Sequence, residues 1–325
     1  MSLKQPPILK VDNLKMHFPV KEGILLRANK FNKAVDGISF EIQPGETLGL
    51  VGESGCGKST LGRCIARLYE PTSGSIEFEG TDITKLKGKA LMPYRQNIQM
   101  IFQDPMESLN SRHTVGDILE EPYIVQKIGD RASRAKRVRE LLDIVGLPAR
   151  SMTRYPFEFS GGQRQRIGIA RSIALNPKLV VCDEPVSALD VSIQSQILNL
   201  LVDLQKEFNL AYLFIAHDLA VVKHISDRIA IMYLGNIVEE STGESIYDEP
   251  RHPYTKSLIS AIPVPDPHLR VKREIITGDV PSPINPPTGC RFHPRCPRVM
   301  ERCKIEAPLL RTIADHQVCC HLDDL

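Results

Sequence analysis

The sequence predicts an α/β fold, and three observations carry that prediction. Residues 8–50 contain short runs in which apolar and polar residues alternate, as in antiparallel strands. Thr47–Val51 is a continuous apolar run that enters a glycine-rich loop and then a helical pattern, as a buried strand does. From Thr114 to Leu175 the apolar residues recur at helical spacing. The chain therefore combines antiparallel strands, a strand–loop–helix unit and a helical part.

The remaining elements follow in order from local patterns. Arg131–Val145 is spaced as a helix and stops at Gly146, a residue type that favours the left-handed backbone of a helix end. A helix that begins at Ser160 must end before Asn176-Pro177, because a residue before proline avoids helical backbone. Further helices are expected at Lys58–Leu68 and Ile193–Phe208, and strands at Ser75–Glu79, Ile98–Phe102, Leu179–Cys182, Tyr212–Ala216 and the hairpin of Ile229–Met232 with Ile237–Glu239.

Composition limits the classes of protein to consider. Of the 325 residues 42% are apolar and 25% are charged, which is typical of a soluble globular chain. The formal net charge of +2 gives no electrostatic argument for binding nucleic acid. The N-terminus lacks the apolar centre of a secretion signal, and apolar runs such as Leu210–Ala216 have the length of strands, too short to span a bilayer. With no such signal, the eight cysteines are expected to be reduced thiols in the cytosol.

Proline content divides the chain into two expected domains. Residues 1–250 contain all the regular patterns, with the helical part at about residues 104–175. Residues 251–325 are rich in proline, which excludes a long helix and predicts an extended linker into a cysteine-bearing tail.

The loop after the first buried strand has the pattern of a phosphate-binding loop. Gly52-Glu-Ser-Gly-Cys-Gly57-Lys58-Ser59 lies between a strand and a helix, so its backbone amides and the positive end of the helix can meet phosphate oxygens. Lys58 is expected to reach the β- and γ-phosphates, and the Ser59 hydroxyl to bind Mg²⁺. The thiol of Cys56 is expected to be structural. The residues expected to contact ATP here are Gly52, Ser54, Gly55, Cys56, Gly57, Lys58, Ser59 and Thr60.

Polar residues at the ends of three other strands supply what hydrolysis requires. Asp183 follows an apolar strand and is expected to hold Mg²⁺, while Glu184 is expected to polarise the attacking water as a general base. Gln103 suits contact with water or Mg²⁺, and His217 suits contact with the γ-phosphate. Each of these two, taken alone, is more typical of an ordinary residue at a strand end.

A second glycine-rich turn, Ser160-Gly161-Gly162-Gln163, opens its own basic helix. Together with the loop, Gln103, Asp183-Glu184, Asp190 and His217, this order of motifs closely resembles the ATP-binding subunits of ABC transporters across about residues 8–245. The resemblance implies a RecA-like core, an antiparallel β subdomain and a helical signature subdomain.

The resemblance also implies a shared ATP site. Two chains would pack head to tail, and Ser160, Gly161, Gly162 and Gln163 of each would complete the ATP site of the other. Asp190 would lie at that interface. Phe18 would stack on adenine, with Phe31 as the second choice and a plain core role for Phe18 as the alternative.

Further matches point to the dipeptide and oligopeptide importer subfamily. They include Gln103-Asp-Pro-Met-Glu-Ser-Leu-Asn110, Tyr155-Pro-Phe-Glu-Phe-Ser160 and His252-Pro-Tyr-Thr-Lys-Ser-Leu-Ile. The resemblance implies a peripheral subunit on the cytoplasmic face of the membrane that pairs with a second, related ATPase chain and two permease subunits. An extracytoplasmic binding protein would deliver di- or oligopeptides, although relatives carry nickel or other small solutes.

Five cysteines lie in the last 36 residues, in the order Cys290, Cys296, Cys303, Cys319 and Cys320. Spacing alone leaves an iron–sulfur cluster, zinc and no metal open, since the tight cysteine pairs of most zinc sites are absent. The segment after Gly289 also resembles the tail of cluster-bearing peptide-importer ATPases. That resemblance implies a [4Fe–4S] cluster on Cys290, Cys296, Cys303 and Cys320, the last preferred over Cys319 because it precedes a histidine.

Two other functions were weighed against the importer. A soluble ABC ATPase that acts on nucleic acid or ribosomes would show two motif sets or a long coiled-coil insertion, and this chain has one set, no such insertion and nearly neutral charge. A chain whose cysteine tail chiefly senses redox state and gates a partner is the third hypothesis. The sequence favours an ATP-hydrolysing importer subunit that uses ATP and Mg²⁺, without a nucleic-acid partner.

Overall fold

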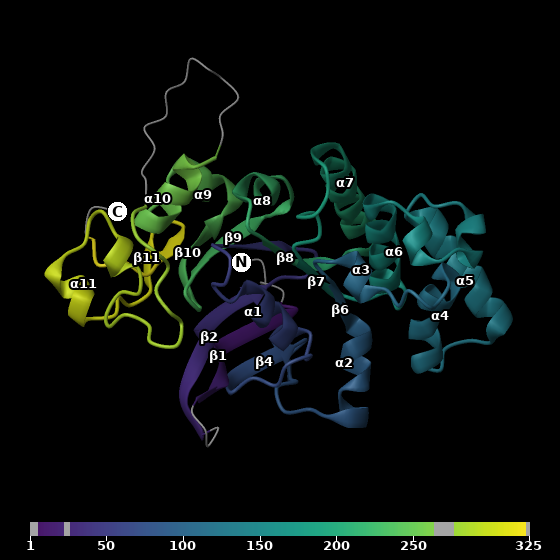
Figure 1. Cartoon of the computed structure of the whole chain (residues 1–325), viewed down its shortest axis with the longest axis horizontal. Coiled ribbons are helices and arrows are strands. Elements are labelled where there is room, and N and C mark those ends of the chain that lie inside the picture. The colour runs from purple at the N-terminus through teal and green to yellow at the C-terminus, as the bar shows by residue number, and fades with distance from the viewer. Residues whose placement is uncertain (1–5, 23–26, 263–275, 323–325) are drawn as a thin grey trace, which may run out of the picture.

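The computed structural model describes residues 6–22, 27–262 and 276–322, and the strands of these segments form two sheets. The strands are β1 (Leu9–Glu22), β2 (Arg27–Ile42), β3 (Thr47–Val51), β4 (Ser73–Phe78), β5 (Thr81–Asp82), β6 (Ile98–Ile101), β7 (Leu179–Asp183), β8 (Ala211–Ala216), β9 (Arg228–Tyr233), β10 (Asn236–Thr242), β11 (Arg311–Ile313) and β12 (His316–Val318). The smaller, antiparallel sheet has the order β2-β1-β4-β5 and the larger one the order β11-β12-β10-β9-β3-β8-β7-β6 (Figure 1). In the larger sheet β9, β3, β8, β7 and β6 are parallel, so their carboxyl ends share one edge.

The helices divide between the central sheet and a separate helical subdomain. They are α1 (Lys58–Ile65), α2 (Met92–Asn97), α3 (Pro105–Ser108), α4 (Val115–Val125), α5 (Arg131–Ile144), α6 (Gly161–Ile173), α7 (Val191–Phe208), α8 (Leu219–Ile225), α9 (Gly243–Asp248), α10 (Pro253–Ser260) and α11 (Glu301–Ile305). Helices α3 to α6 gather at one end of the long axis and α11 lies at the other (Figure 1). None of the described helices combines the length and the apolarity that a membrane crossing needs.

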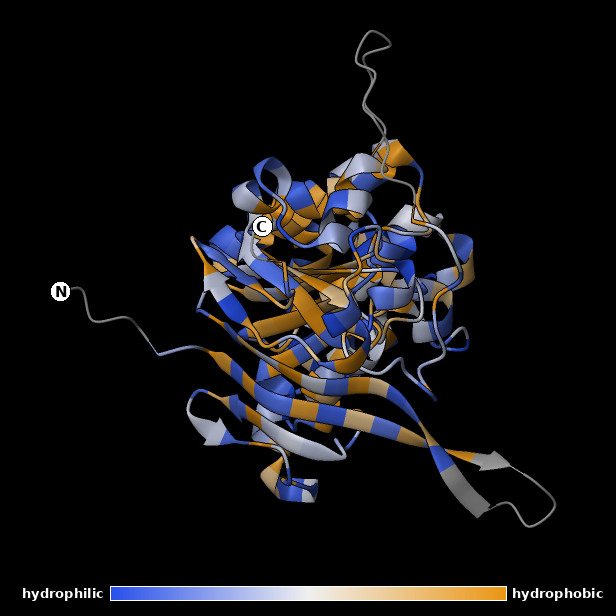
Figure 2. Cartoon of the chain, turned by 90° about the vertical axis from the view of Figure 1, so that its left-hand side faces the viewer, coloured by the Kyte–Doolittle hydropathy of each residue, from blue (hydrophilic) through white to orange (hydrophobic). Residues whose placement is uncertain are grey.

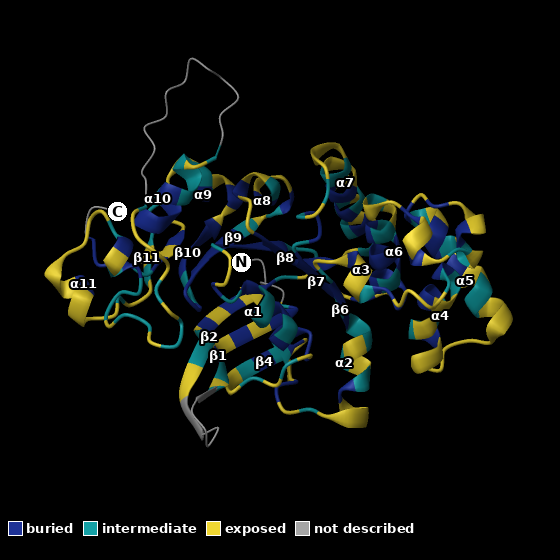
Figure 3. Ribbon diagram, viewed as in Figure 1, coloured by how far each residue is buried: buried dark blue, intermediate teal, exposed yellow. Residues whose placement is uncertain are grey.

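The central strands are buried on both faces. Leu213 and Ile215 of β8 pack with β1, β4 and α1, whereas the alternate residues Tyr212 and Phe214 pack with α7. Because side chains alternate along a strand, β8 supplies both core layers and reads as a continuous apolar run. Figure 2 shows apolar strands at the centre of the molecule, and Figure 3 shows the central strands buried, with exposed residues on the outer helices and on β1, β2 and β4.

Local signals set most element ends, with two corrections. Gly146 has φ 70 after α5, as expected of a left-handed helix end. Helix α1 was expected to reach Leu68 but ends at Ile65, because Arg67 takes a left-handed backbone with φ 53 and donates hydrogen bonds to three backbone carbonyls. The extended linker expected after residue 250 is wrong for residues 253–260. They form α10, with Pro253 at its first turn, where the missing N–H costs nothing.

The region beyond residue 250 extends the central sheet. Strand β12 pairs antiparallel with β10, and β11 pairs with β12. Tyr254 of α10 is fully buried in the main core. Pro263, Pro265 and Pro267, which supported the linker prediction, lie outside the described residues. The domain boundary at residues 250 and 251 stays a prediction.

Candidate functional site

The glycine-rich loop joins β3 to α1 in a backbone path that needs glycine. Gly55 and Gly57 have φ 79 and φ 109, a region that other residues rarely adopt. A Cβ at Gly57 would lie 1.9 Å from the Ala34 carbonyl oxygen, and one at Gly52 would lie 2.1 Å from that of Met232. The loop is therefore pressed against β2 and β9, and its open side faces a pocket.

That pocket has a volume of about 520 Å³ and lies where the two sheets meet. Most of the residues expected to contact nucleotide line it, whereas Gly52 and Cys56 lie behind the loop. The lining consists of Phe18, Asn32, Ala34, Ser54, Gly55, Gly57, Lys58, Ser59, Thr60, Gln103, Glu184 and His217.

The pocket distinguishes between the two aromatic candidates. Phe18 lines it and packs edge-on against Tyr69, with ring centroids 5.6 Å apart. Phe31 is 46% exposed and is not among the lining residues. Asn32 was missed by the sequence reasoning, although its place opposite Phe18 in the β1–β2 register would have found it once that register was known.

Lys58, which lines the pocket, and Asp183, which contacts the lining residue Ser59, are both buried. The Lys58 ammonium donates to the carbonyl oxygens of Gly52 at 2.7 Å and Glu53 at 3.1 Å. Asp183 Oδ1 accepts a hydrogen bond of 2.7 Å from Ser59, while its Oδ2 is buried without a partner. Burial raises the pKa of Asp183 despite the Ser59 hydrogen bond. A buried, unpartnered carboxylate oxygen beside a serine hydroxyl fits a hard cation such as Mg²⁺, whose ligands are oxygens.

Three strand ends converge on Glu184. Its carboxylate accepts from Gln103 Nε2 at 3.1 Å and lies 3.3 Å from His217 Nδ1. Glu184 is mostly buried, with 14% of its side chain exposed, and its backbone has φ 46. The left-handed backbone turns the carboxylate off the end of β7 toward the pocket, where it can meet a water.

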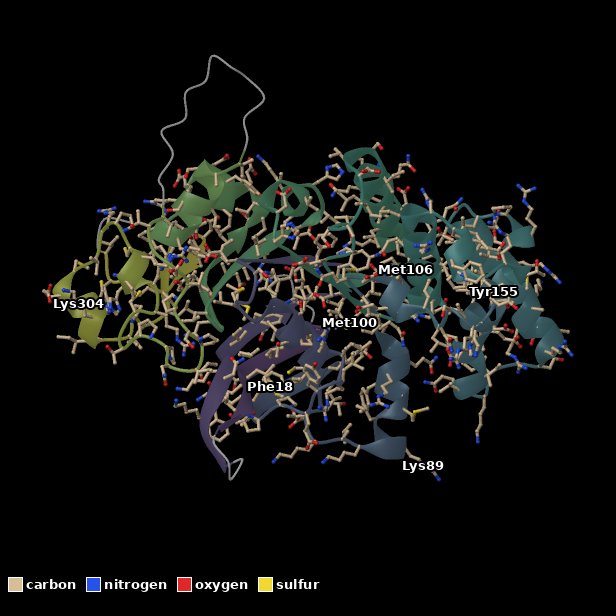
Figure 4. The ribbon with its side chains drawn as sticks, viewed as in Figure 1. Phe18, Lys89, Met100, Met106, Tyr155 and Lys304 are labelled. Atoms are coloured by element: carbon tan, nitrogen blue, oxygen red, sulfur yellow. The ribbon has the colours of Figure 1, made fainter. Side chains whose placement is uncertain are left out.

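The signature turn lies away from the pocket of its own chain. Ser160 caps α6 by accepting a hydrogen bond from Gln163 N, and none of Ser160, Gly161, Gly162 and Gln163 lines the pocket. Figure 4 places Tyr155, in the helical subdomain near the turn, far along the molecule from Phe18. A Cβ at Gly162 would lie 2.5 Å from the Ile193 side chain, so glycine allows α6 to approach α7.

Asp190 precedes α7 as its N-cap residue. Its side chain is exposed and makes no capping hydrogen bond, although aspartate at this position usually does. The carboxylate is therefore presented on the same side of the molecule as the start of α7, beside Val191, which is 78% exposed.

A second pocket, of about 730 Å³, begins at Gln103 and runs between the core and the helical subdomain. It combines apolar side chains such as Met100, Phe102 and Val125 with charged ones such as Arg171 and Glu121. Figure 4 shows Met100 and Met106 at this junction. Because Gln103 lines both pockets, the groove and the Glu184 carboxylate are linked through one side chain.

The tail cysteines lie in the part of the chain beside β10. All eight cysteines are free, and the described residues contain no group of three or more His, Cys, Asp or Glu side chains placed to hold a metal ion. Burial, and after it the charges of Cys320, Cys303 and Cys296, raise the pKa of Cys290 to about 12. Burial raises the pKa of Cys319 to about 11, with Cys320 as its charged neighbour. Three of the other tail thiols therefore affect the pKa of Cys290, whereas only Cys320 affects that of Cys319.

Comparison with known proteins agrees with these motifs. A family model described as "ABC transporter" matches residues 35–187, and one described as "Oligopeptide/dipeptide transporter, C-terminal region" matches residues 238–303. Oligopeptide transport ATP-binding protein AppF of Bacillus subtilis is 52% identical over 322 residues, 98% of each chain. A probable peptide ABC transporter ATP-binding protein of Sinorhizobium fredii is 51% identical over 317 residues, 97% of this chain and 90% of that protein.

Solved structures match the cassette portion. A dimeric ATP-binding cassette in a post-hydrolysis state, bound to ADP and phosphate, gives a TM-score of 0.64 at 29% identity, over 72% of this chain and 98% of its own. The cassette cbiO1 of Clostridium perfringens, part of a transporter complex, gives 0.64 at 28% identity, over 75% and 92%. These neighbours confirm the predicted α/β fold with its RecA-like core.

Proposed function

The chain belongs to the ATP-binding subunits of oligopeptide ABC transporters, and from this premise we propose that it powers the import of di- or oligopeptides by hydrolysing MgATP within a pair of ATPase chains. The chain is an ATPase of the ABC type. The observation that carries the proposal is the meeting of Lys58, Glu184 and His217 in one pocket beside the unpartnered oxygen of Asp183.

Five polar residues of the pocket, together with Asp183, have a role in this proposal. Lys58 exchanges the carbonyls of its own loop for the β- and γ-phosphates. Glu184 takes a proton from the attacking water, which His217 and Gln103 help to orient through their contacts with the same carboxylate. Ser59, Asp183 and Gln103 would hold Mg²⁺, which supplies positive charge to the transferred phosphoryl group.

The ATP site is completed by a second chain. The support is the exposure of the Ser160 turn, its absence from its own pocket, and the free start of α6 that it presents. The amides at a helix start can bind phosphate oxygens, which fits a turn that closes over the nucleotide of a partner. Asp190, uncommitted to its own helix, is assigned to the same interface.

The groove of 730 Å³ is assigned to the permease. It presents apolar side chains within a charged rim, the pattern of protein interfaces, and it ends at the Gln103 that contacts Glu184. A permease segment in this groove would be coupled to hydrolysis through Gln103. The chain would then sit peripherally on the membrane. We place it on the cytoplasmic face, in keeping with eight unpaired cysteines.

The cysteine tail is assigned a [4Fe–4S] cluster on Cys290, Cys296, Cys303 and Cys320. A single ion needs its ligands around one atom, an arrangement that the described residues lack. A four-iron core separates its thiolates further, because each thiolate binds a different iron. Support comes from the pKa values of Cys290, Cys296 and Cys320, which burial raises and the charge of a neighbouring tail thiol raises further.

The decisive experiment replaces Glu184 by Gln and adds ATP. The substituted chain should hold ATP, double its mass by light scattering, alone or with a related ATPase chain, and lose about a thousandfold in kcat, because removing a general base costs roughly 10²–10⁴. Adding Ser160→Arg should abolish the doubling while ATP still binds the loop. Full-rate turnover by Glu184→Gln would show that the base is wrongly assigned, and a hydrolysing monomer would contradict the shared site.

A further inference from the structure

Two arginines between the first two tail cysteines pair with carboxylates next to the elements that line the nucleotide pocket. Arg295 makes a bidentate ion pair with Glu53, the second residue of the glycine-rich loop, at 2.6 and 3.0 Å. Only 7% of the Arg295 side chain is exposed, so water screens this pair little. Arg291 pairs with Asp36 of β2 and donates to the Leu234 carbonyl oxygen at 2.5 Å.

Three groups hold Glu53 by hydrogen bonds, and one of them is the Lys58 ammonium. Its N–H donates to the Tyr254 hydroxyl at 2.9 Å, its carboxylate is bound by Arg295, and its carbonyl accepts from Lys58 at 3.1 Å. The position of the Glu53 backbone therefore determines the position of the Lys58 ammonium in the nucleotide-free chain. Arg295 and Tyr254, both from beyond residue 250, fix that backbone.

Arg291 connects the tail to the β1–β2 sheet that carries Phe18. Asp36 is also 2.8 Å from Nε2 of His17, the residue before Phe18. Burial works to raise the pKa of Asp36, but hydrogen bonds from Arg291 and His17 hold it below its usual value. One short segment of the tail thus contacts the loop through Glu53 and is linked through Asp36 to His17, the neighbour of Phe18.

The base of this segment is rigid. Phe292, between the two arginines, is 1% exposed and packs against Tyr233 and Tyr254 with ring centroids 5.2 and 5.3 Å apart. The Tyr233 hydroxyl also lies 3.5 Å from Arg295 Nη1. When the backbone beside an arginine is fixed by packing, the arginine loses little conformational entropy on forming an ion pair. It can therefore hold its partner in one position.

We propose that Arg295 is a positioning residue of the ATPase, which holds Glu53 so that the loop and Lys58 are preorganised to receive the phosphates of ATP. The proposal rests on the proposed ATP site and adds to it a residue from outside the cassette. Preorganisation lowers the cost of binding, so its loss weakens ATP affinity more than it slows the chemical step. It also makes the cysteine-bearing segment part of the nucleotide site.

The test measures ATP affinity, KM and kcat in the full-length chain with Arg295→Gln. We expect the dissociation constant and KM to rise about tenfold, within the range typical of coupling between sites, with kcat at saturation changed less than about threefold. Arg295→Lys keeps the charge but loses the bidentate geometry of the guanidinium, so it should bind ATP more tightly than Arg295→Gln and less tightly than the unmodified chain. Arg302→Gln is the matched control, since Arg302 makes a similar bidentate pair with Glu306 on the exposed α11.

A purely structural tie between tail and core predicts a different result. It would lower the melting temperature of Arg295→Gln and leave ATP affinity unchanged. The double variant Glu53→Gln with Arg295→Gln removes both charges together and serves if the single variant does not fold. Wild-type affinity in the double variant, or in a folded Arg295→Gln chain, overturns the proposal. Failure of the unmodified chain to bind ATP would instead contradict the proposed function.

Discussion

At the scale of single residues, the pocket stores strain and unpaired charge where they serve the reaction. A left-handed backbone at a non-glycine residue such as Glu184 costs about 1–2 kcal/mol. The buried Oδ2 of Asp183 has no hydrogen bond, which costs about 1–3 kcal/mol. Both costs are paid in the free protein, and the proposed Mg²⁺ would relieve the second.

Asp183→Asn should therefore stabilise the nucleotide-free chain at pH 7 by about 1–2 kcal/mol while abolishing Mg²⁺-dependent hydrolysis. Burial raises the pKa of Asp183 in the folded state, so the ionised carboxylate destabilises the fold fully above that pKa. The gain should fade as pH falls and vanish below the ordinary value of 3.8, where the carboxyl is protonated in both states. Urea unfolding across pH measures this.

The exposed Asp203→Asn is the matched control for that series, and its stability should change by less than about 0.5 kcal/mol. Equal stability of Asp183→Asn and the unmodified chain at pH 7 would contradict the interpretation of Asp183 as an unpaired buried charge.

Residues that act within a motif were predictable, whereas those that act across the fold were not. Lys58 and Glu184 stand in motifs whose chemistry fixes their neighbours along the chain, and the structure brings both into one pocket. The pair of Glu53 with Arg295 joins residues 242 positions apart, and no local pattern marks it. Asn32 needed the β1–β2 register as well, because only that pairing places it opposite Phe18.

At the scale of elements, the tail is organised by its cysteines and by sheet pairing together. Cys290 N donates to the Cys303 carbonyl oxygen at 2.8 Å, so two of the expected ligands are joined through their backbones. Gly289 has φ 65, and a Cβ there would lie 2.4 Å from the same oxygen. The glycine before Cys290 thus lets this segment lie closely against Cys303 of α11.

Cys320→Ser should remove most of the iron and sulfide from chain purified without oxygen, together with the broad visible absorption of a cluster. Cys319→Ser is the matched control and should keep the iron, the sulfide and the visible absorption. Among the tail thiols only Cys320 affects the pKa of Cys319. Loss of iron in Cys319→Ser but not in Cys320→Ser would reverse the choice of fourth ligand. Zinc in place of iron and sulfide would contradict the cluster.

Element type was easier to predict than element length. Apolar runs of strand length indicated β7 and β8, because strands buried on both faces have that pattern in any context. The early end of α1 depends on Arg67, whose guanidinium finds carbonyl acceptors on the β4–β5 side of the core. Helix α10 was hidden by the prolines around it, although proline is well suited to the first turn of a helix.

At the scale of the whole molecule, two pockets share one residue. Gln103 lines the nucleotide pocket and the groove, and it donates to Glu184. A change in the groove can therefore affect the Glu184 carboxylate, the proposed general base, through a single side chain. That arrangement suits a subunit whose ATPase must respond to a permease.

Val125→Glu tests the groove. Val125 is the last residue of α4, is 57% exposed and lines the groove, so a charge there should disrupt docking without unfolding the chain. The isolated chain should hydrolyse ATP within about twofold of its normal rate, as expected of a surface substitution, while co-purification with the permease and peptide uptake fall sharply. Ile305→Glu, 81% exposed on α11, is the control and should change neither. Normal uptake by Val125→Glu would rule out this docking site.

The antiparallel pairing of β12 with β10 also covers the edge of the larger sheet. Deleting residues 288–325 would bare the backbone groups of β10 that the tail now pairs, at Val238, Glu239 and Glu240, and an open strand edge is a template on which other chains can polymerise. The present border, β11, is three residues long and so offers little to such templating. A shortened protein would precipitate for reasons unrelated to thiols, which is why single substitutions, rather than truncation, are the sound way to ask what the tail does.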